Sequence, residues 1–141
     1  MEAAPRILLV DDEGAIRTIC RFNLESDGMT VVEAADGREA IGVIQEAPPE
    51  LVLLDVMMPV VDGWEVASQL ASDPATRDIP VVFLSARASR EDMVRAQELG
   101  AVGYVVKPFD PIELAGFARA VIARVRNGER EQLNRELVDT E

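Results

Sequence analysis

The sequence predicts an α/β protein with a five-stranded parallel sheet covered by helices on both faces. Short apolar runs alternate along the chain with segments of helical periodicity, which is the pattern of repeated strand–helix units. The apolar runs show almost no alternation with polar residues, and this is typical of strands that are buried on both faces. Right-handed crossovers are expected to connect the successive strands.

Five runs of four or five residues are expected to form the strands. Each run is almost entirely apolar and is followed by polar or turn-forming residues. Their ranges are Arg6–Val10, Thr30–Ala34, Leu51–Leu54, Val81–Leu84 and Gly103–Val106.

The first helix is expected over Glu13–Ser26, because apolar residues recur there at helical spacing and Gly28 follows as a stop signal. The only cysteine, Cys20, lies on this apolar stripe. It is interpreted as buried filler, and a redox role is the alternative. Two further helices are expected, one over residues 36–46 that Asp36 can cap and one that begins near Asp62-Gly63 and ends near Ser72.

The fourth helix is expected over residues 89–99, where Ser89 and Asp92 resemble a capping box. Its apolar stripe is thin, so this helix either moves at low cost or is simply a solvated surface helix. The fifth helix starts at Asp110, with Pro111 in the favoured first position. Its apolar residues cover more than one side, which leaves room for a partner interface.

The length of 141 residues suits a single domain, which we expect over residues 5–126. Residues 127–141 begin with a helix stop signal and are polar and acidic overall. Leu133 and Leu137 are four residues apart, which suits a short amphipathic segment. We therefore expect a polar C-terminal tail or the start of a linker there.

The net charge of −12 argues against direct binding to nucleic acid, which needs clustered basic side chains. The absence of histidine excludes histidine-based acid–base catalysis and histidine metal ligands on this chain. No apolar run approaches the roughly 18 residues that a membrane span needs, and the N-terminus lacks the features of a signal peptide. We therefore expect a cytoplasmic protein.

Charged and hydroxyl side chains follow four of the expected strands at their carboxyl ends. These residues are Asp11, Asp12, Asp55, Ser85 and Lys107. The carboxyl ends of parallel strands share one edge of the sheet, where ligands bind in open α/β folds. Lys107 is the only lysine beside thirteen arginines, and its compact ammonium group suits a single phosphate-like oxygen.

This set of residues suits phosphoryl transfer. Neighbouring carboxylates repel one another, and a hard divalent cation such as Mg²⁺ relieves that repulsion. One aspartate could then act as nucleophile, while Lys107 and Ser85 bind the remaining phosphoryl oxygens. The turn-rich segment after Asp55 is expected to leave its carboxylate exposed, and Lys107-Pro108 is a candidate cis peptide.

In order and spacing, these motifs resemble the receiver domain of two-component response regulators over roughly residues 5–126. The matching motifs are Asp11-Asp12, Asp55 with Met58-Pro59 and Asp62-Gly63, Ser85-Ala86, and Lys107-Pro108-Phe109. The resemblance implies a flavodoxin-like three-layer sandwich of five strand–helix units, with strand order 2-1-3-4-5. It also implies that Asp55 is the phosphoacceptor.

The resemblance further implies a Mg²⁺ cofactor. Asp12, Asp55 and the backbone carbonyl of Met57 would bind the ion, and Asp11 would act mainly through metal-bound water.

The same resemblance assigns roles to five residues. Lys107 would contact the phosphoryl oxygens, and Ser85 would contact the same group after activation. Tyr104 matches the aromatic switch position of the family, and a half-buried strand aromatic is the alternative reading. Met57 and Arg87 match positions that tune the lifetime of the phosphoryl group.

The resulting hypothesis is a phosphorylation-activated signalling switch and not an enzyme that turns over a separate substrate. The phosphoryl group would come from a sensor histidine kinase, a phosphotransfer protein or a small donor, and the chain would assist its own phosphorylation and dephosphorylation. The face made by the fourth helix, fifth strand and fifth helix would then bind a protein effector or form a homodimer. A longer regulator with a missing output domain, an aspartate-nucleophile phosphatase and a binding module that accepts no phosphate are the alternatives.

Overall fold

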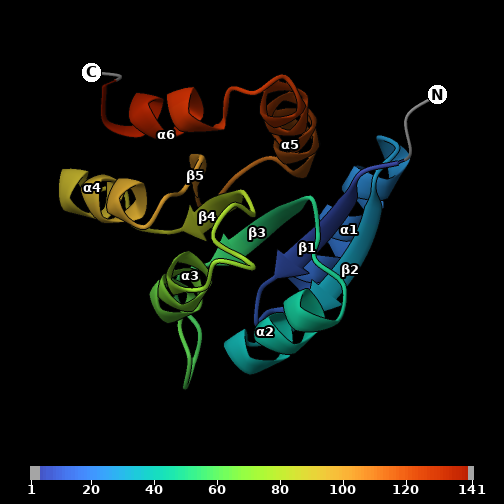
Figure 1. Cartoon of the computed structure of the whole chain (residues 1–141). Helices are drawn as coiled ribbons and strands as arrows, with labels where there is room; N and C mark the ends of the chain where they lie inside the picture. Colours follow the sequence, from blue (N-terminus) through green and yellow to red (C-terminus); the bar gives the residue numbers. More distant parts are fainter. Residues whose placement is uncertain (1–3, 140–141) are drawn as a thin grey trace.

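A parallel sheet of five strands lies at the centre of the computed structural model, which describes residues 4–139 (Figure 1). The order across the sheet is β2-β1-β3-β4-β5, which confirms the order implied by the family resemblance. The strands are β1 (Arg6–Val10), β2 (Thr30–Ala34), β3 (Leu51–Asp55), β4 (Val81–Ser85) and β5 (Gly103–Val106). Because β3 and β4 each extend one residue beyond the expected range, Asp55 and Ser85 are strand residues.

The register of the sheet brings the carboxyl ends of its central strands to one level. Val10 at the end of β1 lies opposite Leu54 of β3, so the residues that follow each of them are neighbours. Asp55 lies opposite Leu84, and Ser85 lies opposite Val106 at the end of β5. Sequence segments that are far apart along the chain therefore meet at this edge.

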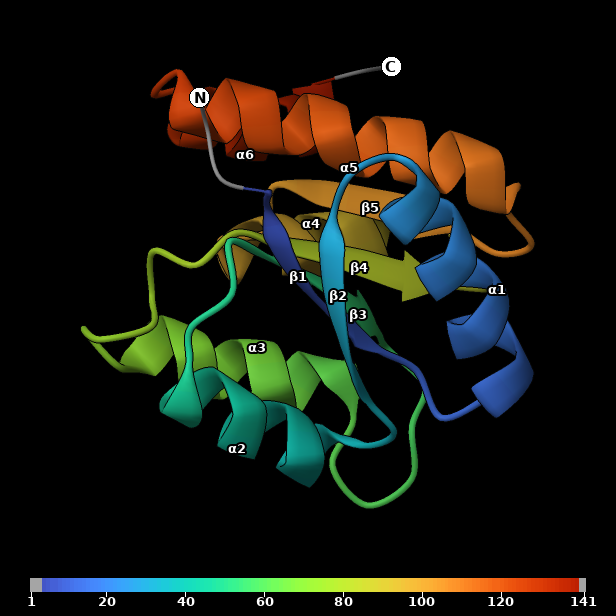
Figure 2. The same ribbon diagram turned by 90° about the vertical axis from the view of Figure 1, so that its right-hand side faces the viewer.

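Helices cover both faces of the sheet. The helices α1 (Gly14–Ser26) and α5 (Pro111–Arg126) lie on one side, and α2 (Gly37–Glu46) and α3 (Gly63–Ser72) lie on the other (Figure 2). The helix α4 (Arg90–Glu98) joins the second side through Ala96, which is its one buried residue. Each side has its own apolar core, and Cys20 is fully buried in the core beneath α1.

Capping side chains open α2, α3, α4 and α5, as expected for Asp36 and Ser89. The side chains of Asp36, Asp62, Ser89 and Asp110 accept hydrogen bonds from backbone N–H groups in the first turns of α2, α3, α4 and α5. Ser89 also donates a hydrogen bond to Asp92, so the expected capping pair is present. At the start of α1, Glu13 makes no side-chain capping bond, and the helix begins one residue later than expected.

The C-terminal segment contains a sixth helix, α6 (Arg130–Asp139), which lies against α4, β5 and α5 (Figure 1). Leu133 is buried in the core shared with α5, and Leu137 packs against the core on the α4 side. The amphipathic segment expected around Leu133 and Leu137 therefore docks on the domain. Met1–Ala3 at the N-terminus and Thr140 and Glu141 of the expected tail lie outside the described residues. Among residues 4–139, no helix has both the length and the apolar character needed to cross a membrane.

Candidate functional site

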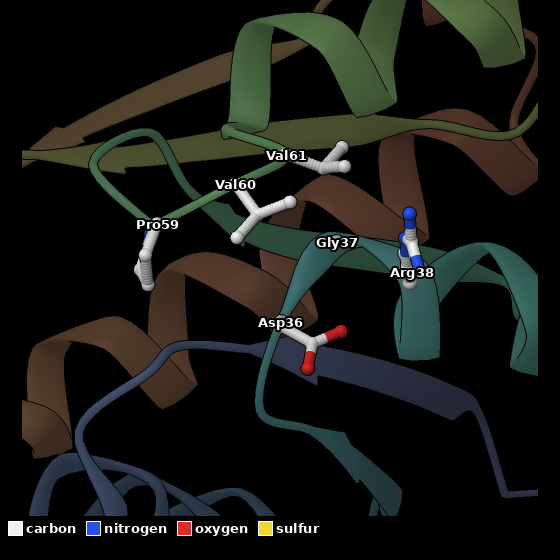
Figure 3. Close-up of a pocket in the computed structure, with 6 residues that line it drawn as sticks. All are labelled: Asp36, Gly37, Arg38, Pro59, Val60 and Val61. Carbon is white, nitrogen blue, oxygen red and sulfur yellow. The ribbon is translucent and has the colours of Figure 1, made fainter.

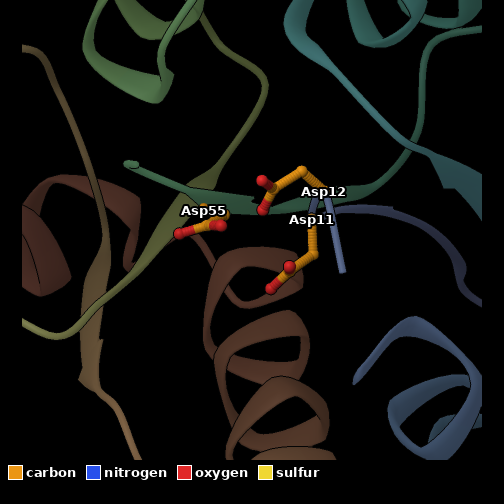
Figure 4. Close-up of side chains that lie close together, drawn as sticks. All are labelled: Asp11, Asp12 and Asp55. Atoms are coloured by element: carbon orange, nitrogen blue, oxygen red, sulfur yellow. The ribbon is translucent and has the colours of Figure 1, made fainter. Parts of the chain in front are cut away.

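Three carboxylates meet at the carboxyl edge of the sheet, as the sequence predicted. Asp11 and Asp12 follow β1, and Asp55 ends β3, so the sheet register places them side by side (Figure 4). One oxygen atom from each residue lies within 4.8 Å of the others. Asp11 and Asp55 are buried, whereas Asp12 is exposed and forms the solvent side of the cluster.

The prediction that the Asp55 carboxylate is exposed is wrong. The residue is only 3% exposed, because it is part of β3 and the following loop folds back over it. Gly63 at the start of α3 makes this return possible, since a Cβ atom there would lie 2.3 Å from the backbone oxygen of Asp55. Burial, together with the charge of Asp11, raises the pKa of Asp55 to about 6, and Lys107 opposes that rise.

Lys107 is the cation of the site. Its Nζ atom lies 2.8 Å from Oδ2 of Asp11 and 3.4 Å from Oδ2 of Asp55. Burial alone would lower the pKa of this ammonium group, but the hydrogen bond to Asp11 and the two negative charges raise it. The backbone N–H of Lys107 donates to the carbonyl of Ser85 at 2.7 Å, and the Lys107–Pro108 peptide is cis, as expected.

A second layer of contacts orients Asp11. Its Oδ1 atom accepts a hydrogen bond from the Glu13 N–H at 2.9 Å, and its carbonyl accepts one from Nη1 of Arg17 at 2.7 Å. The Nε of Arg17 is bound in turn to Glu33 at 3.0 Å, and Glu33 also accepts from Arg21. This network was not predicted from the sequence. Its only signal was a charged residue, Glu33, within the otherwise apolar run of β2.

Ser85 ends β4 at the carboxyl edge of the sheet, and Tyr104 lies on the neighbouring strand β5, opposite Phe83. Ser85 is fully buried, and its Oγ accepts a hydrogen bond from the Arg87 N–H at 3.1 Å. The Tyr104 hydroxyl donates to the Arg87 carbonyl at 2.8 Å, so the loop after β4 links the two side chains. Burial raises the pKa of the Tyr104 phenol. The side chains of Arg87 and Met57 are exposed, and their roles in phosphoryl lifetime stay predictions, as does the Met57 carbonyl as a ligand.

The donor set fits a hard divalent cation. The grouped ligand atoms are carboxylate oxygens, which Mg²⁺ prefers. Exposure of Asp12 leaves solvent access on one side, which suits an ion that keeps part of its hydration shell.

A separate hollow lies between the loops that precede α2 and α3 (Figure 3). It is lined by Asp36, Gly37, Arg38, Pro59, Val60 and Val61. The Asp36 carboxylate is used there as the cap of α2 through the Glu39 N–H. None of the residues predicted for phosphoryl chemistry lines it, so we interpret this hollow as part of the loop packing.

Comparison with known proteins connects this arrangement to one family. Residues 7–119 match the response regulator receiver domain family. The phosphate regulon transcriptional regulatory protein PhoB of Escherichia coli is 45% identical over 122 residues, which are 86% of this chain and 53% of PhoB. The DNA-binding dual master transcriptional regulator RpaA of Synechocystis is 39% identical over 120 residues, 85% of this chain and 50% of RpaA. The chain thus spans about half the length of the curated relatives that it matches.

Solved structures show the same relationship. The chemotaxis protein CheY4 of Vibrio cholerae superposes with a TM-score of 0.79 at 34% sequence identity. That match covers 84% of this chain and 99% of CheY4.

Proposed function

The chain belongs to the family of response regulator receiver domains, which are phosphorylation-activated signalling switches, and on this premise we propose that Asp55 accepts the phosphoryl group. The observation that carries the proposal is the meeting of Asp11, Asp12 and Asp55 with Lys107 at one edge of the sheet. Such a site combines a nucleophile, a place for a cation and a positive charge for the transferred group.

Of the two buried carboxylates, Asp55 is better suited than Asp11 to act as the nucleophile, because its oxygen atoms make weaker hydrogen bonds. Both oxygens of Asp11 are used, one by the Glu13 N–H and one by Lys107. Asp55 accepts only a long hydrogen bond of 3.3 Å from the Met57 N–H, and Lys107 is 3.4 Å from its other oxygen. Asp12 is exposed and lies at the solvent side.

In the proposed reaction, one Asp55 oxygen attacks the phosphorus atom of the donor. A bond between that oxygen and phosphorus forms as the bond between phosphorus and the donor atom breaks, and the electron pair leaves with the donor. Lys107 is placed to neutralise charge on the phosphoryl oxygens. Asp12, Asp55 and the Met57 carbonyl would hold Mg²⁺, with Asp11 acting mainly through metal-bound water, and the ion would supply further neutralisation of the phosphoryl charge when bound.

The phosphoryl group would then act as a new anion next to Lys107 and Ser85. Attraction of both side chains toward it would alter the loop after β4, to which Tyr104 is hydrogen-bonded. The surface formed by α4, β5 and α5, named here the output surface, would change as a result. We propose that this surface serves a protein effector, an output domain or a homodimer, and that the chain does not itself bind nucleic acid.

Membership of the family implies partners that donate the phosphoryl group, namely histidine kinases or phosphotransfer proteins. Which of these serves this chain is part of the proposal. We also propose that the chain assists only its own phosphorylation and dephosphorylation, without turnover of a separate substrate. The cytoplasmic location stays a prediction.

Labelling by a small phosphodonor tests the proposal. With acetyl phosphate and Mg²⁺, intact-mass spectrometry is expected to show one added phosphoryl group on the wild-type chain and none on Asp55→Asn. Asp62→Asn is the matched control, because it makes the same chemical change seven residues away and Asn caps a helix about as well as Asp. Full labelling of Asp55→Asn would overturn the assignment, and removal of Mg²⁺ by EDTA should abolish labelling of the wild type.

A further inference from the structure

Helix α6 covers part of the output surface. It lies across α4, β5 and α5 on the outside of the domain (Figure 1). Leu133 is only 7% exposed and joins a core that includes Val102 beside β5 and Val121 of α5. Leu137, one turn later, packs against the second core with Leu99 and Tyr104. One face of α6 therefore spans both cores at the edge of the sheet.

Polar contacts give this docking a defined geometry. The Nδ2 atom of Asn134 donates to the carbonyl of Gln97 at 3.0 Å and to that of Ala101 at 2.7 Å. The Nε2 atom of Gln97 donates back to the Asn134 carbonyl at 3.1 Å. These bonds join the middle of α6 to the end of α4 and to the segment that leads into β5. Any shift of α4 relative to β5 would disturb them.

A charged contact anchors the same helix to α5. The guanidinium of Arg124 forms a pair of hydrogen bonds with the two carboxylate oxygens of Glu136, at 2.9 and 2.8 Å. Its Nε atom also donates to Glu129, just before α6. These contacts raise the pKa of Arg124. The Arg124 guanidinium on the output surface is thus placed to bind an acidic residue of the helix that covers this surface.

The expected switch residue takes part in this contact region. Tyr104 and Met93 line a hollow of about 300 Å³ together with Phe117 and Leu137. The Tyr104 hydroxyl is held by the Arg87 carbonyl, two residues after Ser85. A change at Ser85 that moves the Tyr104 ring would therefore change the wall against which Leu137 lies. Hydrogen bonds thus connect Ser85 to Arg87 and Arg87 to Tyr104, and Tyr104 shares the lining of the hollow with Leu137.

We propose that α6 is an intramolecular competitor for the output surface, held there in the unphosphorylated chain and released when Asp55 is phosphorylated. This inference rests on the function proposed above. The partner that the vacated surface fits is an amphipathic helix of the same kind as α6. It would carry two apolar residues four positions apart, an amide side chain next to the first of them, and an acidic residue that reaches Arg124.

The short link between α5 and α6 makes the competition strong. Only residues 127–129 separate the two helices, so α6 acts at an effective concentration in the millimolar range or above. A helix from a separate molecule must exceed this effective concentration before it displaces α6 from the output surface. A coupling between phosphorylation and α6 release of about tenfold lies within the usual range for linked sites.

Amide hydrogen exchange on the complete 141-residue chain tests the release directly. After phosphorylation with acetyl phosphate and Mg²⁺, protection of residues 130–138 is expected to fall about tenfold, while protection of α2 stays unchanged. Intact-mass spectrometry of the same sample reports whether Asp55 has been phosphorylated. A phosphorylated chain with unchanged α6 protection would overturn this inference alone, and a chain that gains no phosphoryl group would overturn the function on which it rests.

A peptide in trans tests the competition. The probe is a fluorescent peptide with the sequence of residues 129–139, and its binding to the unphosphorylated chain is measured by anisotropy. Asn134→Ala loosens the resident helix, so the probe is expected to bind this variant about tenfold more tightly than the wild type. Gln45→Ala is the control, because it removes an exposed helical amide from α2 rather than from α6. Equal affinity for Asn134→Ala and for the control would contradict the competition.

Discussion

The Nζ atom of Lys107 lies 2.8 Å from Oδ2 of Asp11, a carboxylate that is completely buried. The ammonium group therefore compensates a charge that is buried away from bulk solvent. The same atom is only 3.4 Å from Asp55, so a short movement takes it from one carboxylate to a phosphoryl group on the other. This position suits a movable charge that responds to phosphorylation.

Replacing Lys107 by arginine should impair switching more than phosphoryl uptake. The guanidinium keeps the positive charge, but its planar fork cannot follow one oxygen as a compact ammonium does. We expect Lys107→Arg to accept a phosphoryl group with Mg²⁺, and to lose most of the phosphorylation-induced chemical-shift change at Tyr104 and in α4. The control is Arg119→Lys, the reverse exchange in an exposed ion pair with Asp27. Wild-type shift changes in Lys107→Arg would refute this role.

Removing the Asp55 charge should stabilise the metal-free chain at neutral pH. The raised pKa of about 6 means that, between about pH 4 and pH 6, the folded chain keeps a proton on Asp55 that the unfolded chain has lost. The contribution of Asp55 to the free energy of unfolding therefore falls as the pH rises from about 4 to 6. Asn does not titrate, so Asp55→Asn should exceed the wild type in unfolding free energy by about 1–3 kcal/mol above pH 6.

Urea unfolding of both proteins from pH 4 to pH 7.5 measures this difference. Saturating Mg²⁺ serves as the control, because the cation should restore stability to the wild type and reduce the gap. A gap that does not change with pH in the metal-free proteins would show that Asp55 is not the residue responsible.

Arg17 should support Mg²⁺ binding without touching the ion. It holds the Asp11 carbonyl and is itself held by Glu33, so its loss would free the loop that carries Asp11 and Asp12. Loss of such supporting contacts typically costs 10–100-fold in metal affinity, and we expect a decrease of about tenfold for Arg17→Ala by isothermal titration calorimetry. Arg21→Ala is the matched control, since Arg21 also binds Glu33 but makes no bond to Asp11. An equal loss in both variants would point to Glu33 instead.

Val60 should be replaceable by glycine with a gain in stability. Its φ of 67° lies in the left-handed region, which is unfavourable for a β-branched residue, and its side chain is 90% exposed. Val60→Gly is expected to raise the free energy of unfolding by about 1 kcal/mol. Val60→Ala keeps the Cβ atom and should gain less. Thermal unfolding that ranks Ala at or above Gly would contradict the assigned strain.

Much of the fold follows from local sequence features. The strands lie where largely apolar runs predicted them, and Asp36, Asp62, Ser89 and Asp110 cap their helices because each precedes a helical segment. The meeting of the carboxylates with Lys107 also followed from the sequence, since parallel strands share one carboxyl edge.

Other features depend on contacts between distant segments and could not be predicted. The burial of Asp55 results from the close return of the chain at Gly63, and the loop sequence alone suggested exposure. The bond from Arg17 to the Asp11 carbonyl depends on the packing of α1 beside β2. The docking of α6 joins Asn134 to residues more than thirty positions earlier, which the spacing of two leucines did not reveal.

Chemical mapping of the phosphoryl group determines whether Asp55 carries it. After exposure of the wild-type chain to acetyl phosphate and Mg²⁺, borohydride reduction converts an acyl phosphate of aspartate into homoserine. Peptide mass spectrometry is then expected to find homoserine at position 55 alone. Homoserine at position 11 or 12, or a phosphoryl group that resists reduction because it sits on a hydroxyl, would contradict the account.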